Sequence, residues 1–379
     1  MKKNAIKGLT ISELEDFAVS IGEQRYRGKQ LFDWLYMKEA DSFLAMSTFS
    51  KSLREKLDGV AEIVSLKVAA RQESVQDGTT KILFELVDEK RIESVLIPPS
   101  TAFQSGNADN EEQKRLTLCV STQVGCPLDC KFCATATMGF LRNLTPAEIV
   151  DQVMQARRIS GKRITNLVFM GMGEPLMNYE NVMKSIEIIT NGLKITGRRI
   201  TISTAGWVPK IRQMADERRK VKLAVSLHSL NDEARTSLMP INAKYPLAEL
   251  LESIQYYYKK TKQRVTFEYI LFDNWNDRDE DVRKLVKLSK SIPCKINIIP
   301  FHRIDFAEPA GIALQLRPTP LKRAEEFVKM LRDAHVSVFV RSSSGEDIDA
   351  ACGQLVVKTD QRKNIKRKSS YSSLLVHSA

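Results

Sequence analysis

Six apolar stretches of strand length alternate with amphipathic helical stretches through the central part of the chain. They occupy residues 116–120, 164–170, 199–204, 221–226, 265–271 and 295–300. Apolar residues at three- and four-residue spacing follow each stretch, which is typical of helices packed on a sheet. These repeated β-α units predict an α/β fold with a parallel sheet, either open or curled into a partial barrel.

The ligand site of a parallel sheet lies at the carboxyl ends of its strands. Residues of unusual type stand at or just after these ends: Cys126, Cys130 and Cys133 after the first stretch, Gly173 and Glu174 after the second, Ser203 in the third, Ser226, Leu227 and His228 at the fourth, and His302 after the sixth. We therefore expect a single site at this edge of the sheet.

The three cysteines of the first loop have C-x3-C-x2-C spacing. A [4Fe–4S] cluster normally binds four thiolates, so three closely spaced cysteines leave one iron open to an outside ligand. Such an iron can hold the amine and carboxylate of S-adenosylmethionine, and reductive cleavage of this sulfonium yields a 5′-deoxyadenosyl radical. The spacing therefore predicts a radical enzyme whose cluster ligands are Cys126, Cys130 and Cys133.

Structural zinc is the alternative for these cysteines, with Cys119 as the fourth ligand of a closed tetrahedron. Zinc ligand pairs usually have C-x2-C spacing, and zinc gives no role to the motif Gly171-Met172-Gly173-Glu174-Pro175. In that motif the glycines allow the backbone to approach a ligand closely, and Glu174 can accept a hydrogen bond from an ammonium group. We therefore favour an S-adenosylmethionine site.

The remaining segments predict a modular chain. Residues 1–60 have helical periodicity, with a polar, basic turn at 23–30 between two helices. Residues 61–113 form a β-rich linker region of a few antiparallel strands that ends in a polar surface loop at 100–113. The β-α repeats fill 114–345, a cysteine-containing loop occupies 346–357, and 358–379 is a basic tail.

The charge balance favours a polyanionic partner. The chain has 58 basic and 46 acidic residues, a net charge of +12, and residues 358–370 contribute six basic residues and one acid. Basic tails often bind polyanions, and about as often they are solvated chain ends. No run of about 18 apolar residues occurs, and the first residues lack the apolar stretch of a secretion signal, so we expect a cytoplasmic protein without a membrane segment.

The sequence resembles the RlmN/Cfr family of radical S-adenosylmethionine RNA methyltransferases. The resemblance rests on the three-cysteine loop with Phe132 before its last thiol, on Gly173-Glu174-Pro175, and on Asp347-Ile348-Asp349-Ala350-Ala351-Cys352-Gly353-Gln354-Leu355. Pro175 favours the RlmN branch, because Cfr-like sequences tend to carry Ala there. The resemblance implies a partial (β/α)6 radical S-adenosylmethionine barrel with a short β extension, and an RNA-binding role for the helical unit at 1–60.

The activity that the resemblance implies is methylation of C2 of adenosine 2503 in 23S rRNA and, for many RlmN members, of adenosine 37 in tRNA. The Cfr branch methylates C8 of the same rRNA adenosine and remains the alternative. The family uses one [4Fe–4S] cluster, two S-adenosylmethionine molecules per turnover and an electron donor such as flavodoxin or ferredoxin. We expect a monomer whose partners are 23S rRNA and tRNA.

Carried over to this chain, the family mechanism makes Cys352 the central residue. Its thiolate accepts a methyl group, a radical removes hydrogen from that S-methyl group, and the resulting carbon radical adds to the base. Cys119 then attacks the Cys352 sulfur, forming a disulfide that releases the product. Glu93 matches the family glutamate that takes the proton from the adduct, although from its pattern alone it is a solvated strand residue.

The resemblance also assigns the cofactor contacts. The matching positions are Gly173, Glu174, Ser203, Ser226, Leu227, His228 and His302. His302 stands where the family commonly has Asn, and it lacks the paired donor and acceptor of an amide. A protein-activating or sulfur-inserting radical enzyme leaves Cys119 and Cys352 without a joint role, and a zinc-stabilised RNA-binding protein is the non-enzymatic alternative.

Overall fold

The computed structural model describes residues 3–99, 115–341 and 344–357. The basic tail at 358–379 and the polar loop at 100–113 lie outside these residues. A ten-stranded sheet with strand order β14-β13-β12-β11-β10-β9-β6-β5-β4-β3 forms the centre of the described chain. The predicted parallel strands are β6 (Thr117–Cys119), β9 (Asn166–Phe169), β10 (Ile200–Thr204), β11 (Lys222–Ser226), β12 (Val265–Leu271) and β13 (Cys294–Pro300).

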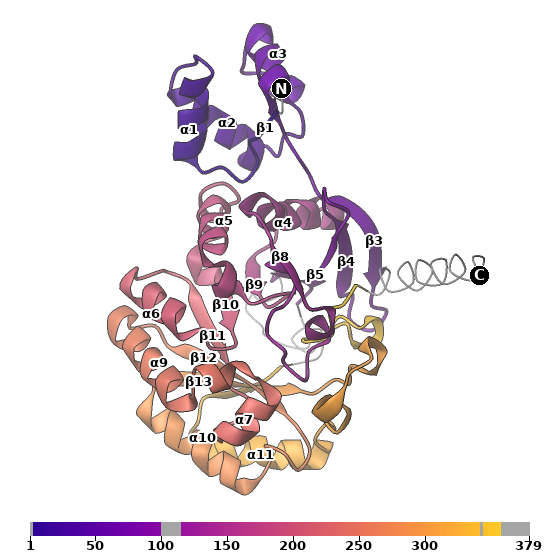
Figure 1. Ribbon diagram of the computed structural model, residues 1–379, viewed down its shortest axis with the longest axis vertical. Helices are drawn as coiled ribbons and strands as arrows, with labels where there is room; N and C mark the ends of the chain where they lie inside the picture. The colour runs from indigo at the N-terminus through magenta and orange to yellow at the C-terminus, as the bar shows by residue number, and fades with distance from the viewer. Residues whose placement is uncertain (1–2, 100–114, 342–343, 358–379) are drawn as a thin grey trace, which may run out of the picture.

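Helices follow these strands along the chain and lie on the outer side of the sheet (Figure 1). They are α4 (Pro146–Ser160), α5 (Tyr179–Asn191), α6 (Val208–Asp216), α7 (Asp232–Leu238), α8 (Ile241–Lys244), α9 (Leu247–Thr261), α10 (Asp279–Ser291) and α11 (Leu321–Asp333). The expected α/β fold of the radical S-adenosylmethionine type is confirmed. None of the helices in the described ranges is long and apolar enough to cross a membrane.

The sheet is wider than the six predicted strands. A seventh parallel strand, β14 (Val338–Val340), pairs with β13. On the other side β5 (Arg91–Ile97) pairs antiparallel with β6, and β4 (Thr80–Glu85) and β3 (Lys67–Glu73) continue the antiparallel order. The antiparallel strands expected within 61–98 therefore exist, and they extend the same sheet.

The loop that contains Cys126, Cys130 and Cys133 is closed by a hairpin that the sequence did not predict. The hairpin consists of β7 (Gln123–Gly125) and β8 (Phe140–Asn143), which pair antiparallel as a separate two-stranded sheet. A 3₁₀ helix, η4 (Ala134–Met138), connects the last cysteine of the loop to β8. Both ends of the cysteine loop are therefore fixed next to the carboxyl end of β6.

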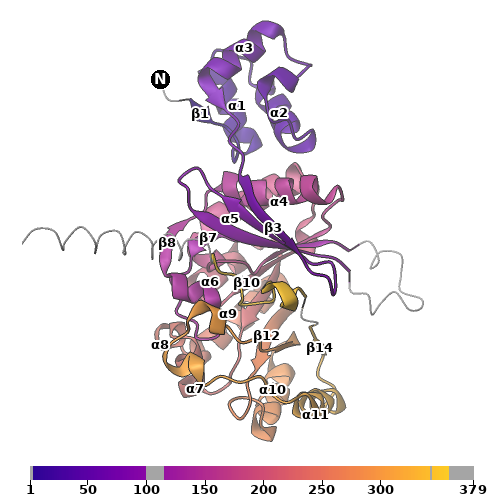
Figure 2. The same cartoon turned by 90° about the vertical axis from the view of Figure 1, so that its right-hand side faces the viewer.

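Helix α4 begins as the sequence predicts. Thr145 is the N-cap, and a capping box joins its hydroxyl to the Glu148 N–H and the Glu148 carboxylate to the Thr145 N–H. All eight residues from 149 to 156 are buried. A helix that is buried around its whole circumference is covered on more than one side. Figure 2 shows the reason, since α4 lies between the sheet and the N-terminal helices.

The N-terminal unit contains α1 (Ile11–Ser20), α2 (Tyr26–Phe32), a π-helical turn η1 (Asp33–Met37), a 3₁₀ turn η2 (Phe43–Ala45) and α3 (Lys51–Val60). Its ends meet because β1 (Asn4–Ala5) pairs in parallel with β2 (Ala61–Glu62). The predicted turn at 23–30 is wrong in its second half, because α2 begins at Tyr26. Arg27 and Lys29 therefore lie on the first turn of a helix, and Arg25 directly precedes it.

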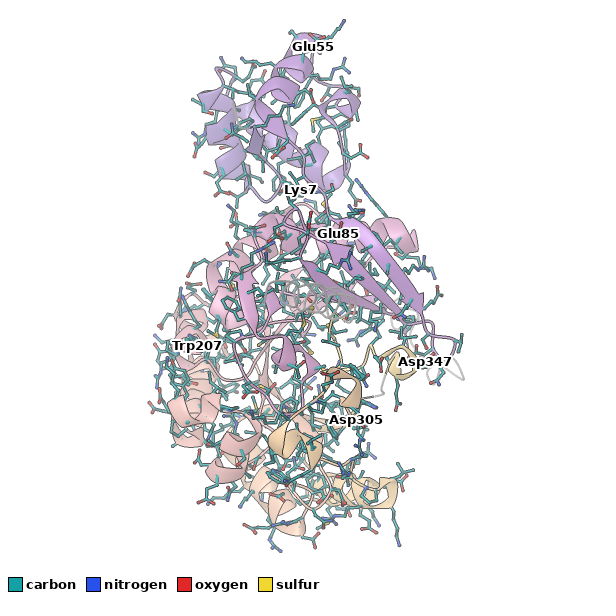
Figure 3. All side chains as sticks on the ribbon, turned by 45° about the vertical axis from the view of Figure 1, so that its right-hand side comes forward. Lys7, Glu55, Glu85, Trp207, Asp305 and Asp347 are labelled. Atoms are coloured by element: carbon teal, nitrogen blue, oxygen red, sulfur yellow. The ribbon has the colours of Figure 1, made fainter. Side chains whose placement is uncertain are left out.

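A buried ion pair joins the N-terminal unit to α4. The Lys7 ammonium lies 2.5 Å from the Asp151 carboxylate, and both side chains are almost completely buried. The second oxygen of Asp151 accepts a hydrogen bond from the Leu66 N–H. Figure 3 places Lys7 at the neck between the helical unit and the sheet. One carboxylate thus holds both chain segments that cross this neck.

Candidate active site

The cysteine loop brings its three thiols into mutual electrostatic contact. The Cys133 N–H donates to the Cys130 carbonyl at 3.1 Å, which folds the loop into a tight turn. Burial, with a smaller contribution from the charge of Cys133, raises the pKa of the Cys126 thiol to about 12. Burial likewise raises the pKa of Cys130 and Cys133. Cysteine binds a metal as the thiolate, whereas burial favours the protonated thiol. A bound metal cation is therefore what ionises such a group of buried thiols.

This arrangement fits an iron–sulfur cluster better than zinc. In the described ranges, no three His, Cys, Asp or Glu side chains are arranged as ligands of a single metal ion. A cluster instead distributes its thiolates over separate irons. Cys119, the fourth ligand in the zinc alternative, lines a cavity together with Cys352, and none of the three loop cysteines is among the residues that line it. The donor set is therefore three thiols.

The aromatic residue before the last thiol packs on the end of the sheet. The ring of Phe132 lies edge-on to the ring of His228, with 4.7 Å between centroids. His228 Nδ1 accepts a hydrogen bond from the Ile270 N–H at 3.0 Å. Burial lowers the pKa of His228 to about 3, with the charge of Arg235 adding to the effect. His228 is thus a neutral histidine whose Nδ1 is used by the backbone of β12.

Glu174 connects the ends of β9 and β10. Its Oε2 accepts a hydrogen bond from the Ala205 N–H at 2.8 Å, and its Oε1 accepts one from the Leu176 N–H at 3.0 Å. Burial raises the pKa of Glu174 to about 7, although these backbone donors oppose the shift. The carboxylate lies near the thiols, because its charge raises the pKa of Cys126 and Cys130.

The glycine beside Glu174 permits a contact within the protein. Gly173 has φ +99°, and a Cβ there would lie 2.5 Å from the Cβ of Gln123 on β7. Gln123 also accepts a hydrogen bond from the Glu174 N–H at 2.8 Å. The close approach that the sequence indicated at this motif is therefore to the hairpin that carries the cysteine loop.

Arg235 is a site residue that sequence reasoning missed. Its buried guanidinium donates hydrogen bonds to the carbonyls of Ala205 (2.8 Å), Ser226 (2.9 Å) and Leu227 (3.1 Å). It therefore fixes the carboxyl ends of β10 and β11 together. Its positive charge also lowers the pKa of Cys130. A single arginine on a short amphipathic helix gives no sequence signal for either contact.

The serines and Leu227 have different positions at these strand ends. Ser203 on β10 and Ser226 on β11 are half-buried, near the carboxyl ends of their strands. The side chain of Leu227 is completely buried, and its N–H donates to the Glu268 carbonyl at 3.0 Å. Leu227 therefore belongs to the core through its side chain, and only its backbone reaches the site.

A cavity of about 1940 Å³ contains the second group of predicted residues. Cys119, Cys352 and His302 line it. Single-ligand pockets are usually about 300–1,000 Å³, so this cavity is larger than one small molecule requires. Cys352 is exposed into the cavity, and Cys119 is buried at the end of β6. The structure thus brings the two cysteines of the expected disulfide to one space.

The loop that carries Cys352 packs directly on the cysteine loop. The Ala134 N–H donates to the Gly353 carbonyl at 2.7 Å, and the Thr135 hydroxyl donates to the Leu355 carbonyl at 2.7 Å. Gly353 has φ +83°, and a Cβ there would lie 3.1 Å from the Phe132 carbonyl oxygen. Glycine after Cys352 therefore allows the two loops to touch.

The residues on both sides of Cys352 are buried. Ala350, Ala351 and Leu355 are buried, while Cys352 is exposed. The adjoining 3₁₀ turn, η9 (Glu346–Ile348), is tied to the β3–β4 turn, since Asp347 accepts a hydrogen bond from the Val75 N–H at 3.2 Å. Figure 3 shows Asp347 beside the tips of these strands. The loop is thus anchored on two sides.

Glu93 is connected to the same loop. Its Oε2 accepts a hydrogen bond from the Val356 N–H at 2.9 Å, and the Lys81 ammonium lies 3.9 Å from its Oε1. Glu93 is buried, which corrects the interpretation of this residue as a solvated strand position. It is not among the described residues that line the cavity.

His302 also contacts the segment before Cys352. Its Nδ1 lies 3.2 Å from Glu346 Oε1, and the His302 side chain is largely buried at the cavity wall. The residue that departs from the family pattern therefore faces a carboxylate on η9.

Three polar residues inside the cavity were not predicted. Asn297 donates a hydrogen bond to Glu268 Oε1 at 3.0 Å, and Arg341 Nη1 lies 3.7 Å from Glu268 Oε2. Burial raises the pKa of Cys119 to about 12, and the charge of Arg341 opposes this shift. The only sequence signal was a polar residue inside each of two apolar stretches, Glu268 in 265–271 and Asn297 in 295–300.

Two family models match the chain. The model for the ribosomal RNA large subunit methyltransferase N-terminal domain matches residues 5–63, and the model for the radical SAM superfamily matches residues 120–286. The first covers the N-terminal helices, and the second covers the sheet from the residue after β6 into α10.

Relatives of known name match nearly the whole chain. It is 45% identical over 365 residues to the probable dual-specificity RNA methyltransferase RlmN of Thermoanaerobacter sp. (strain X514), covering 96% of this chain and 99% of that protein. It is 43% identical over 364 residues to that of Christiangramia forsetii, covering 94% and 97%. The crystal structure of a radical SAM methyltransferase from Sphaerobacter thermophilus has a TM-score of 0.82 at 40% identity, covering 93% and 99%.

Identity at this level over almost the full length of both chains establishes the family. Membership implies a [4Fe–4S] cluster and S-adenosylmethionine as cofactors, and the three loop thiols fit the cluster. The chain belongs to the RlmN family of dual-specificity RNA methyltransferases, within the radical SAM superfamily.

Proposed function

We propose that the chain methylates C2 of adenosine 2503 in 23S rRNA and C2 of adenosine 37 in tRNA. The observation that supports this most directly is that Cys119 and Cys352 line one cavity, beside a loop with three cluster thiols. The relatives named as dual-specificity RNA methyltransferases support the two classes of RNA. A reduced flavodoxin or ferredoxin is the proposed source of electrons.

The bound cofactors supply the methyl group and the hydrogen-abstracting radical chemistry. The residues of the chain then have separate roles. Cys126, Cys130 and Cys133 are the proposed cluster ligands, and Cys352 carries the methyl carbon to C2 of the base. Glu93 takes the proton from the adduct carbon, and its hydrogen bond to Val356 keeps its carboxylate next to the Cys352 loop.

Release of the product is the proposed task of Cys119. Before this step the adduct radical gives up one electron to the oxidised flavodoxin or ferredoxin. The Cys119 thiolate then attacks the Cys352 sulfur, and the new S–S bond forms. The bond between that sulfur and the methylene carbon breaks with its electron pair going to the methylene carbon, which takes up a proton to become the methyl group. The disulfide is then reduced before the next turnover. Burial raises the pKa of the Cys119 thiol, and the charge of Arg341 opposes this increase and so favours the thiolate.

Cations on the cavity wall are suited to the RNA backbone. Arg115, Arg198, Lys220, Lys222, Arg264 and Lys295 line the cavity. Within residues 3–99, 115–341 and 344–357, none of them forms an ion pair with a carboxylate. They stand before or at the first residues of their strands, so they line the cavity at the end of the sheet opposite to Cys119. Cations without a carboxylate partner favour phosphate binding. On α2, by contrast, Lys29 pairs with Asp33 at 2.9 Å, and Arg25 before it pairs with Glu15.

The Cys119→Ala variant tests the proposed chemistry. Without the attacking thiol the adduct is not released, so we expect a covalent protein–RNA species after one turnover, seen as a shifted band that nuclease digestion reduces. Cys294→Ala is the matched control, because Cys294 is buried at the start of β13, outside the cavity lining. Free turnover by the Cys119→Ala variant contradicts the assigned role.

The position of the methyl group is tested on the product. Mass spectrometry of nucleosides from RNA treated with the wild-type protein is expected to give 2-methyladenosine from both 23S rRNA and tRNA. A product with the methyl group at C8 indicates the Cfr-type reaction instead. Methylation of rRNA alone contradicts the tRNA part of the proposal.

A further inference from the structure

A buried carboxylate in the cavity has one oxygen without a hydrogen-bond donor. Glu268 is only 4% exposed, and it lines the same cavity as Cys119 and Cys352. Among the described residues, no donor lies within hydrogen-bond distance of its Oε2, and the Arg341 guanidinium is 3.7 Å away. Buried polar atoms are nearly always paired in folded proteins. The exception indicates a ligand that donates a hydrogen bond at this point.

The orientation of this carboxylate is fixed from both sides. Glu268 lies directly opposite Asn297 in the pairing of β12 with β13, and the Asn297 amide donates to Oε1 at 3.0 Å. Arg341, at the end of β14, lies 3.7 Å from Oε2 and also contacts the Met170 sulfur at 3.4 Å. Oε2 is therefore a positioned acceptor rather than a mobile side-chain end.

We propose that Glu268 Oε2 accepts a hydrogen bond from the exocyclic amine of an adenine, and that this adenine is the RNA base to be methylated. The inference rests on the proposed function and adds a residue that selects the base. Adenine presents an N6 amine as donor, whereas a 6-oxo purine presents a carbonyl oxygen at the same place. A carbonyl facing a carboxylate leaves both acceptors unpaired, which disfavours the wrong base.

S-adenosylmethionine also contains an adenine with this amine, so the adenine at Glu268 has to be assigned either to the RNA or to the cofactor. The RNA base is favoured by the cavity itself, which contains Cys352, the residue proposed to carry the methyl carbon. Of the seven proposed cofactor contacts, His302 lines this cavity, whereas the other six are not among the described residues that line it. The carboxylate thus lies with the residues that act on RNA.

The substrate arm of the test uses the loaded enzyme and three short RNAs. They carry adenosine, purine riboside or inosine at the target position, and all three keep the hydrogen on C2. Single-turnover rates at subsaturating RNA measure the preference. A hydrogen bond to a charged group contributes about 1.5–3 kcal/mol, so wild type should prefer adenosine over purine riboside by about tenfold to hundredfold. Inosine should react no faster than purine riboside.

The protein arm repeats these measurements with Glu268→Gln, which keeps the shape of the side chain. The preference for adenosine over purine riboside should fall toward equality, because the charge-assisted hydrogen bond is lost. Glu325→Gln on the exposed side of α11 is the matched control and should keep the wild-type preference. Asn297→Ala frees Oε1 from its donor and should lower the preference partly.

Three results overturn the inference. Equal rates of the wild-type protein on the adenosine and purine riboside RNAs show that no residue recognises the amine. An unchanged preference in Glu268→Gln shows that another group reads the amine. Weaker S-adenosylmethionine binding by Glu268→Gln in equilibrium dialysis, with an unchanged substrate preference, assigns the carboxylate to the cofactor. Failure of wild type to methylate the adenosine RNA at C2 instead contradicts the proposed function.

Discussion

Individual charges at the sheet edge are set mainly by burial. The carboxyl of Glu174 and the imidazole of His228 are both shifted toward their neutral forms, to pKa values of about 7 and about 3. The Arg235 guanidinium is buried as well, and burial lowers its pKa to about 10, so it remains charged at neutral pH. The proposed cofactor site thus holds one buried group that stays positively charged, Arg235, and two groups that burial shifts toward their neutral forms, Glu174 and His228.

The neutral state of His228 predicts a specific pH dependence of stability. Its pKa is about 3 in the fold and about 6.5 in the unfolded chain. Between these values the unfolded chain binds one proton more, so this residue makes the fold less stable as the pH falls below 6.5. The expected slope is about 1.4 kcal/mol per pH unit.

The measurement compares wild type with His228→Gln in urea unfolding at pH 7 and pH 5. At pH 7 the variant should be less stable, because it loses the ring contact with Phe132. At pH 5 its deficit should be smaller by about 2 kcal/mol, since only wild type must exclude a proton. A deficit that is the same at both pH values contradicts a neutral buried His228.

At the scale of elements, two loops form one unit at the mouth of the sheet. The cysteine loop and the Cys352 segment are joined by the hydrogen bonds of Ala134 to Gly353 and of Thr135 to Leu355. They are 220 residues apart in sequence at the second contact. The position of Cys352 relative to the cluster thiols therefore depends on a few hydrogen bonds between loops.

The Thr135→Val variant tests this connection. Valine keeps the shape but leaves the buried Leu355 carbonyl without its donor, which destabilises the contact by about 1–3 kcal/mol. Hydrogen exchange of residues 350–357 should become faster, while β12 and β13 should be unchanged. Thr137→Val is the control, since the Thr137 hydroxyl bonds the Ala134 carbonyl inside its own turn. Equal exchange in both variants contradicts the proposed anchoring.

Elements with a strong local signal were predictable from the sequence. The capping box at Thr145 and Glu148 marked the start of α4, and the apolar runs marked β12 and β13. The strands β7 and β14 have three residues each, which is too short for an alternating pattern to be recognised. The polar, basic sequence at 23–30 was predicted to be a turn, because its first residues show no apolar periodicity. Tertiary contacts determine that a helix begins there.

For the molecule as a whole, motifs predicted the reactive cysteines but not the residues that support them. Cys126, Cys130, Cys133 and Cys352 stand in compact patterns that can be recognised locally. The side chains of Arg341 and Met170 meet across 171 residues of sequence. Four strands lie between β9 and β14 in the sheet, so this contact is created by the curvature of the sheet and not by pairing of neighbouring strands. Sequence periodicity gives the strands but not which side chains share a cavity.

The attachment of the N-terminal unit is also a property of the whole molecule, and it depends on the ion pair between Lys7 and Asp151. Both groups are almost completely buried, at 2% side-chain exposure each. Removing one partner of a buried pair leaves an uncompensated charge and destabilises a protein by about 3–5 kcal/mol. Lys7→Met should therefore lower the free energy of unfolding by about this amount and expose the neck at 63–66 to proteases.

Two further variants separate the buried charge from a general loss of contact at this junction. Lys184→Met removes an ion pair with Glu13 across the same interface, but this pair is partly exposed, so about 0–1 kcal/mol is expected. Lys7→Met combined with Asp151→Asn leaves no buried charge and keeps an oxygen for the Leu66 N–H, so it should recover much of the lost stability. If the double variant is no more stable than Lys7→Met in denaturant unfolding, the N-terminal unit is held by its apolar contacts with α4, and the ion pair does not determine its attachment.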